Sequence, residues 1–201
     1  MSFYDALRFA NWMNNGQGGG DTETGAYTLV GGAPEPTNGT TVTRNAGATI
    51  FLTSEDEWYK AAYYHVLPTP VYYDYPAGSD TQTTCATPTA LANRANCGFA
   101  MGGDLTDVGS YTGSPSPYGT FDQGGNVIEW NESIIGSNRG VRGGGNNENP
   151  SELAASTRFD SGPTLEHQDV GFRVAMIPEP NTGLLVISGL LGLGLRRRAA
   201  D

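Results

Sequence analysis

Only two stretches of this chain carry the pattern of an amphipathic helix, and glycine or proline interrupts most of what lies between and after them. The 201 residues include 29 glycines and 12 prolines. This content is high for a helical protein, yet 10 tyrosines, 7 phenylalanines and 3 tryptophans argue against disorder. The composition favours a loop-rich fold anchored by buried rings, with room for one domain or for one domain and a tail.

The first helix is predicted in MSFYDALRFANWMNNG, residues 1–16, and the second in TSEDEWYKAAYY, residues 53–64. Ser2 and Asp5 have the spacing of a capping box, and Thr53 or Ser54 caps the second helix ahead of an acidic first turn. The residues expected to face the core are Phe3, Leu7, Ala10, Trp58, Ala61 and Ala62, with Phe9 and Tyr59 as further candidates.

Short runs of β-branched and aromatic residues predict strands between long loops. Residues 66–107 show little periodicity and are expected to be irregular. The predicted strands lie in GAYTLVGG (25–32), TTVTRNAGATIFL (40–52), DVGSY (107–111), VIEW (127–130), GVRGG (140–144) and GFRVA (171–175). This organisation predicts an α+β fold, in which a disulfide or a metal fixes the long loops.

The charge of the chain argues against nucleic-acid binding. The formal net charge is −10, and Lys60 is the only lysine, whereas phosphate contacts need clustered lysine and arginine. An acidic surface suits solubility, and grouped carboxylates and carbonyls suit a hard cation such as Ca²⁺.

The two cysteines, Cys85 and Cys97, leave two interpretations open. In an oxidising compartment they would form one disulfide, which in the chain-entropy model stabilises the fold by roughly 3 kcal/mol. Otherwise they are two small buried thiols.

Residues 121–130, FDQGGNVIEW, place a polar, glycine-rich stretch between two aromatic residues. A hairpin turn explains the glycines. It does not explain the two carboxylates, Asp122 and Glu129, which on that interpretation merely face solvent.

The C-terminal stretch, MIPEPNTGLLVISGLLGLGLRRRAAD, resembles the PEP-CTERM sorting signal of exported bacterial proteins. A Pro-Glu-Pro turn precedes a short apolar segment, residues 183–195, and a basic cluster. The matching residues are Pro178, Glu179, Pro180, Arg196, Arg197 and Arg198. The apolar segment is short for a bilayer core of about 30 Å, and its glycines argue against the alternative of a buried core helix.

The sorting-signal resemblance implies export across the inner membrane and processing by an exosortase, with the mature protein at the cell surface or in the extracellular matrix. We therefore expect a domain at residues 1–175 and a sorting signal at residues 176–201. The N-terminus has no basic or apolar region of a signal peptide. Our hypothesis is that the chain is truncated or that its start is assigned too late, which upstream coding sequence for a signal peptide would support.

Five blocks of the sequence are similar, in order, to the formylglycine-generating (sulfatase-modifying factor) domain family. They are FYDALRFANWMNNG, LTSEDEWYKAAYY, YGTFDQGGNVIEW, RGVRGGG and GFRVA, and they span nearly all of residues 2–175. The resemblance implies a C-type-lectin-like fold with two helices, a small twisted antiparallel sheet and abundant loops. It also implies strands before the first helix, so a chain extended upstream is expected to be more stable.

For residues 121–130 the resemblance implies calcium binding. The implied ligands are the side chains of Asp122 and Glu129 and the backbone carbonyls of Gly125 and Val127. Ca²⁺ takes about six to eight oxygen ligands in flexible geometry, and a tight glycine-rich loop lets carbonyls turn inward.

Enzymes of this family oxidise a cysteine of their sulfatase substrate with O₂ and copper, through a pair of active-site cysteines between the RGG and GFR blocks. Residues 146–170 of this chain contain no cysteine, and Cys85 and Cys97 lie in another block. Thiolate is the soft ligand that Cu(I) prefers, so neither copper nor this activity is expected. His167, one of two histidines, is interpreted as a surface loop residue.

Two hypotheses follow. The favoured one is an exported, non-catalytic binding or structural module that presents loops 66–107 and 145–169 to an unidentified glycan or protein. The alternative is a divergent enzyme of the family with protein-cysteine oxidation or other oxidoreductase chemistry. Copper binding, or oxidation of a cysteine-containing peptide, would favour the second.

Overall fold

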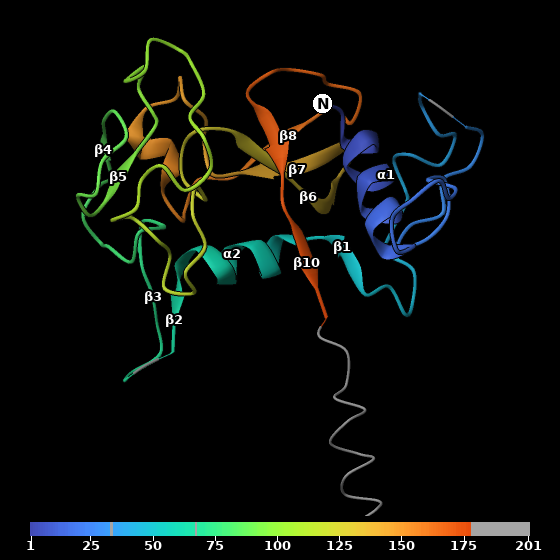
Figure 1. The fold of residues 1–201 in the computed structure, drawn as a ribbon, viewed down its shortest axis with the longest axis horizontal. Coiled ribbons are helices and arrows are strands. Elements are labelled where there is room, and N and C mark those ends of the chain that lie inside the picture. The colour runs from blue at the N-terminus through green and yellow to red at the C-terminus, as the bar shows by residue number, and fades with distance from the viewer. Residues whose placement is uncertain (33, 67, 178–201) are drawn as a thin grey trace, which may run out of the picture.

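The computed structural model describes residues 1–32, 34–66 and 68–177 (Figure 1). Helix α1 (Phe3–Asn14) lies at one end, the long loops of residues 73–127 gather at the other, and a four-stranded sheet lies between them. The expected sorting signal, residues 178–201, lies outside the described residues. Within the described ranges, no helix is long and apolar enough to cross a lipid bilayer.

Both predicted helices form, and each begins with a capping box. In α1 the Ser2 hydroxyl accepts a hydrogen bond from the Asp5 N–H at 3.2 Å, while the Ser2 N–H donates to Asp5 Oδ2 at 3.0 Å. Ser54 and Glu57 make the same pair of bonds at the start of α2 (Glu55–Tyr63). The cap of the second helix is thus Ser54 and not Thr53.

The central sheet has the strand order β8–β7–β6–β9. Its strands are β6 (Ile128–Ile135), β7 (Asn138–Arg142), β8 (Phe159–Ser161) and β9 (Val170–Phe172). Strands β6, β7 and β8 are antiparallel, whereas β9 runs parallel to β6 with Gly171 opposite Glu129. The expected antiparallel sheet is therefore extended by one parallel edge strand.

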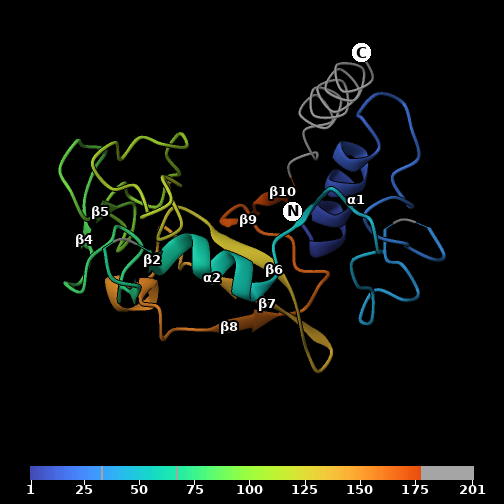
Figure 2. The ribbon, with the colours of Figure 1, turned by 90° about the horizontal axis from the view of Figure 1, so that it is seen from below.

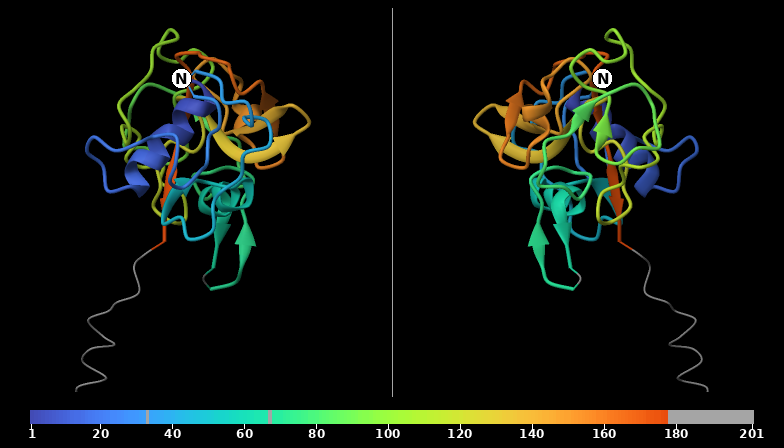
Figure 3. Two further views of the ribbon diagram at one scale, coloured as in Figure 1. Left: turned by 90° about the vertical axis from the view of Figure 1, so that its right-hand side faces the viewer. Right: turned by 90° about the vertical axis from the view of Figure 1, so that its left-hand side faces the viewer.

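The remaining strands form three two-stranded sheets: β1–β10 and β2–β3 are antiparallel, and β4–β5 is parallel. The bounds of these strands and of the 3₁₀ helix η1 are β1 Ile50–Leu52, β2 Tyr64–His65, β3 Val71–Tyr72, β4 Thr84–Cys85, β5 Arg94–Ala95, β10 Val174–Met176 and η1 Pro150–Leu153. The β2–β3 hairpin projects from the body of the molecule (Figure 3).

Loops replace the strands predicted at residues 25–32 and 107–111, and of the strand predicted at 40–52 only Ile50–Leu52, β1, forms. In the first of these, a side-chain amide takes the hydrogen bonds that a neighbouring strand would supply. Asn38 Oδ1 accepts from the Val30 N–H at 3.0 Å, and Asn38 Nδ2 donates to the Thr28 carbonyl at 2.8 Å. Backbone groups paired in this way are not available to a sheet.

The main core lies between α1, the β1–β10 pair and the central sheet. Phe3 and Trp130 are buried there with their rings edge-to-face at 5.8 Å, whereas Phe9 is 41% exposed. Helix α2 runs beneath the sheet (Figure 2) and buries Trp58 in a second, smaller cluster. Together these contacts fix the start of β6, where the candidate site lies.

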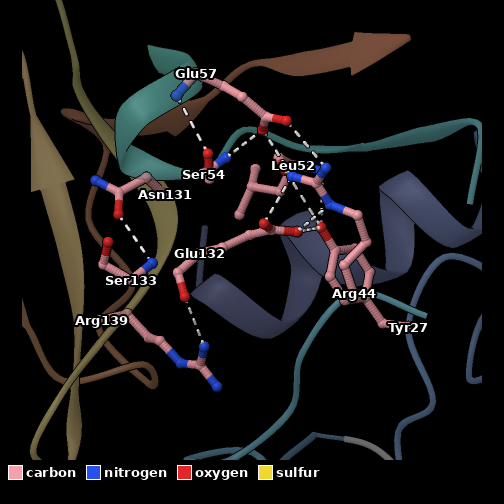
Figure 4. A network of polar contacts seen from close by, with 9 residues as sticks. All are labelled: Tyr27, Arg44, Leu52, Ser54, Glu57, Asn131, Glu132, Ser133 and Arg139. Carbon is pink, nitrogen blue, oxygen red and sulfur yellow. Dashed lines mark hydrogen bonds and ion pairs between the residues drawn. The ribbon is translucent and has the colours of Figure 1, made fainter. Parts of the chain in front are cut away.

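A polar network fastens the loop before β1 to α2 and to the sheet (Figure 4). Arg44 Nη2 lies 2.7 Å from both Glu57 Oε2 and Glu132 Oε2. The Tyr27 hydroxyl donates to Glu132 Oε1 at 2.5 Å. Burial, reinforced by Glu132, raises the pKa of Tyr27 far above its ordinary value, so the hydroxyl keeps its proton and remains a donor.

Candidate functional site

Residues 121–127, the loop before β6, have a backbone that suits glycine better than most residues. Asp122, Gly125 and Asn126 have φ angles of 56°, 82° and 65°, which lie in the left-handed region. A Cβ atom on Gly125 would lie 2.5 Å from the carbonyl oxygen of Asn96. Only glycine fits there, because the two backbones touch.

Asn126 ties this loop to three other segments. Its N–H donates to the Asn96 carbonyl at 2.8 Å, and its own carbonyl accepts from the Asn146 N–H at 3.0 Å. Its side chain accepts from the Thr106 N–H at 2.9 Å and donates to the Thr106 carbonyl at 3.1 Å. This role of Asn126 was not predicted; the available signal was an asparagine after two glycines, since asparagine tolerates the left-handed conformation.

Asp122 is held by one of its two carboxylate oxygens. Oδ2 accepts from the Gly109 N–H at 2.6 Å, whereas Oδ1 has no hydrogen-bond partner among the described residues. Burial raises the pKa of Asp122; the Gly109 N–H and Arg173 oppose the rise, and Glu129 adds to it. A cation at Oδ1 would offset this cost of burying the charge.

Glu129 is 4% exposed, and its carboxylate is fully engaged by donors. Arg173 donates to it twice, from Nε to Oε2 at 2.5 Å and from Nη2 to Oε1 at 2.6 Å. The indole N–H of Trp58 donates to Oε2 at 2.6 Å. Glu129 therefore does not face solvent. The simple turn interpretation, which required both carboxylates to face solvent, is wrong for this residue.

Three of the four predicted calcium ligands line one cavity, whereas the fourth, Gly125, is not part of its lining. Asp122, Val127 and Glu129 line one cavity of about 290 Å³ together with Arg173. In the part of the chain that the structure describes, the carbonyls of Gly125 and Val127 accept no hydrogen bond, so both are available as ligands. The donors are the hard oxygens that Ca²⁺ prefers, but an ion here would share Glu129 with Arg173.

The two cysteines are joined as a disulfide with a Cα–Cα distance of 4.8 Å, so this chain, which has only two, carries no free thiol. Cys97 is fully buried against Leu153. The next residue, Gly98, donates its N–H to the Glu148 carbonyl at 2.7 Å. Through Gly98, the disulfide region is therefore bonded to residues 146–170, the segment in which the resemblance places the cysteine pair of the family's enzymes.

A second cavity, of about 420 Å³, is lined by residues of the central sheet and of the segments at 148–152 and 165–169. Its apolar lining includes Ile128, Val141 and Val170, and its polar lining includes Glu148, Glu152, Asp160, His167 and Asp169. The His167 ring contacts the Asp169 carboxylate through Nδ1. Sequence reasoning predicted a presented loop at 145–169 but not the cavity, because acids spread over an irregular segment form no periodic pattern.

Comparison with known proteins adds the family. The family described as sulfatase-modifying factor enzyme 1-like domain, FGE-sulfatase, matches residues 1–177 of this chain. The chain belongs to the FGE-sulfatase family. No curated protein matches it. The fold is accordingly the loop-rich, C-type-lectin-like α+β fold of this family.

Solved structures share this FGE-sulfatase fold at low sequence identity. Treponema denticola variable protein 1 is 22% identical, with a TM-score of 0.64 over 89% of this chain and 70% of that one. CarF is 20% identical, with a TM-score of 0.57 over 89% and 67%. PvdO from Pseudomonas aeruginosa is 20% identical, with a TM-score of 0.51 over 89% and 60%. Such identities show the fold alone.

In this FGE-sulfatase domain the arginines of the RGG and GFR blocks bind carboxylates and backbone. Arg142 Nη2 lies 2.6 Å from Glu55 Oε1, and its Nη1 donates to the Ala155 carbonyl at 3.0 Å. Arg173 binds Glu129 and also donates to the Phe121 carbonyl at 3.2 Å. Both residues tie loops to the core.

Proposed function

We propose that this domain is a non-catalytic binding module that acts at the bacterial cell surface and is stabilised by calcium. The observation that carries the proposal is the state of the thiols. Both cysteines are used in the disulfide between Cys85 and Cys97, and the second cavity is lined by carboxylates, apolar side chains, Ser161 and His167, with no cysteine or methionine among the described lining residues. The soft ligands that copper chemistry requires are absent from that lining.

Calcium would be held by the side chain of Asp122 and the carbonyls of Gly125 and Val127, with Glu129 contributing while it remains paired to Arg173. The free Oδ1 atom of Asp122 and the two free carbonyls support this assignment. The described residues contain no group of three or more carboxylate, histidine or cysteine side chains that could hold a metal. A calcium site here would therefore draw much of its oxygen from the backbone, as the glycine-rich loop allows.

The surface location rests on the sequence of residues 176–201. The Pro-Glu-Pro sequence, the apolar segment and the three arginines support an exosortase and the inner membrane as partners during export. The loops at 66–107 and 145–169 would then be the parts of the domain that meet an external glycan or protein.

One observation favours the alternative of a divergent enzyme. The contact between His167 and Asp169 at the second cavity is the kind of histidine–carboxylate pair that moves protons in acid–base catalysis. Such an enzyme would have oxidoreductase or other chemistry without a thiol. Copper binding by the full chain would favour such an enzyme, and oxidation of a cysteine-containing peptide would establish it and refute the non-catalytic proposal.

The calcium part is tested by thermal unfolding of the full chain in Ca²⁺ and in a chelator. Binding to the folded state alone adds about 2.7 kcal/mol of stability when the free ion is at 100 times its Kd. Asp122→Asn keeps an acceptor for the Gly109 N–H but removes the charge, so the calcium-dependent rise in Tm should be lost. The matched control is Asp56→Asn on the exposed face of α2, which should keep it. No rise in the unaltered protein would refute the calcium site.

A further inference from the structure

The β2–β3 hairpin carries an uncharged, apolar surface on an otherwise acidic protein. Residues 64–73 contain no aspartate, glutamate, lysine or arginine, whereas the whole chain has a net charge of −10. Among the described residues of the hairpin, Val66, Val71 and Tyr72 are 48%, 38% and 50% exposed. Apolar side chains grouped on a projecting element mark a surface that contacts another molecule or a membrane.

Tyrosine rings surround the base of the hairpin, and valines lie nearer its tip. Tyr64 and Tyr72 pair across the two strands, with ring centroids 4.9 Å apart. The Tyr64 ring also stacks on the exposed ring of Tyr118 at 6.3 Å. Val71 belongs to the next residue pair towards the tip, and Val66 follows β2. Tyrosine suits the boundary between water and an apolar phase, because its ring is apolar and its hydroxyl is polar.

The tip of the hairpin also has few backbone donors. Pro68 and Pro70 are both exposed there, and proline has no N–H group. A backbone N–H without a hydrogen-bond partner is costly in an apolar phase. The two prolines therefore lower the cost of moving this tip out of water.

The hairpin and the end of β10 project from the same side of the domain (Figure 1, Figure 3). Met176 and Ile177, at that end of the described chain, are also exposed. Only residues 178–182 separate Ile177 from the apolar segment at 183–195, and five residues reach at most about 18 Å when fully extended. A membrane that holds the apolar segment would therefore lie on the side to which the hairpin points.

We infer that the β2–β3 hairpin docks on the surface of the membrane that holds residues 183–195. The valines and prolines of the tip enter the boundary between headgroups and acyl chains, and the tyrosines lie at the level of the headgroups. Lys60 Nζ lies 5.5 Å from the centre of the Tyr64 ring, which places the only lysine of the chain beside these headgroups. The net charge of −10 disfavours anionic lipid, so the partner is a zwitterionic lipid surface.

This inference rests on the proposed association with the inner membrane. It adds a second point of contact to the one supplied by residues 183–195. Two separate contacts fix the orientation of the domain on the membrane, which a single flexible attachment does not.

The first test measures contact with lipid directly. The full chain carrying Val71→Trp is mixed with phosphatidylcholine vesicles whose acyl chains are brominated, because bromine quenches only tryptophans that reach the bilayer. The fluorescence that this variant adds to that of the three native tryptophans should be quenched. Val30→Trp, an equally conservative change at an exposed valine outside the hairpin, is the control and should not be quenched. Quenching of neither variant, or of both equally, would overturn the inference.

The second test measures the strength of binding. Val66→Ser with Val71→Ser should lower the partition coefficient of the full chain on phosphatidylcholine vesicles at least about tenfold, since two apolar side chains lose their contact with lipid. The matched control, Val30→Ser with Leu91→Ser, changes two side chains that are more exposed than those of the hairpin. It should leave the coefficient unchanged. Equal partitioning of the two double variants would overturn the inference.

The proposed location and the hairpin contact can fail separately. If the unaltered full chain does not bind vesicles, the association with the inner membrane fails and the inference fails with it. If the chain binds but Val71→Trp is not quenched, the hairpin contact alone fails. Light scattering without lipid tests a second copy of the chain as the partner. A dimer that Val66→Ser with Val71→Ser converts to a monomer would overturn the lipid assignment.

Discussion

Arg173 and Glu129 form a two-point ion pair that joins the link between β9 and β10 to the start of β6 in the central sheet. The two N–O distances are 2.5 and 2.6 Å, and the side chains are 21% and 5% exposed. The pair occupies the position where the family resemblance puts a calcium ligand. Arginine and calcium would therefore act on the same carboxylate, and their contributions to stability are separable by mutation.

Arg173→Ala should destabilise the domain by about 3–5 kcal/mol in a chelator, because it leaves a buried carboxylate without its charged partner. Urea unfolding measures the loss. Calcium should restore part of it if the ion takes over Glu129. Arg158→Ala is the control: its side chain is 51% exposed in its ion pair with Glu55, and it should cost less than about 1 kcal/mol. Equal losses in the two variants would contradict the buried-pair account.

Gly125→Ala should cost about 2–4 kcal/mol, since the new Cβ would lie 2.5 Å from a backbone oxygen and φ is +82°. Gly47→Ala separates the two causes: its φ is +84° with nothing within 4 Å of the new Cβ, so it should cost only about 1–2 kcal/mol. Both values come from urea unfolding. If both glycines cost the same, contact with Asn96 does not constrain the loop.

The stability supplied by Glu57 should disappear in acid. Burial alone would raise the pKa of Glu57, but hydrogen bonds from Arg44 and the Ser54 N–H outweigh it and hold the pKa below its ordinary 4.5. A carboxyl with a lowered folded pKa stabilises fully above its unfolded pKa and loses that effect as pH falls through the folded one. The stability difference between the unaltered protein and Glu57→Gln should thus be constant above about pH 5.5 and shrink below pH 4.5. A stability difference that grows as the pH falls would contradict the prediction, because it would mean that folding raises the pKa of Glu57.

Reducing the disulfide between Cys85 and Cys97 should lower the free energy of unfolding by roughly 3 kcal/mol, given the sequence separation of 12 residues. Urea unfolding with and without reductant measures the change. The Cys85→Ala, Cys97→Ala double variant should be insensitive to reductant. If reductant leaves the unaltered protein unchanged, the disulfide carries little of the stability of this region.

Local signals predicted the helices well. Ser2 with Asp5, and Ser54 with Glu57, are three residues apart, so both capping boxes are visible in the sequence and both form. The strands with aromatic and β-branched runs near Trp130 and Val141 were found for the same reason. These features depend on neighbours along the chain.

Features that depend on distant residues were missed. Val30 has the sequence of a strand residue, but Asn38 takes its N–H, and nothing local announces that competition. Glu129 was predicted as a ligand, yet its pairing with Arg173 spans 44 positions. The acidic cavity was missed for the same reason, since its lining comes from four strands, the 3₁₀ helix η1 and two loop segments that meet only in the folded protein.

The pairing of β10 with β1 has a mechanical consequence. The chain leaves the described domain through β10, which is held by three residue pairs to β1 and by the bond from the Ile177 N–H to the Thr49 carbonyl at 2.9 Å. Tension applied to the chain beyond residue 177 enters the domain at this point. A pull along the strand loads all these contacts at once, whereas a pull away from β1 breaks them one after another, beginning at Ile177. The direction in which the domain is tethered would therefore set the force it withstands.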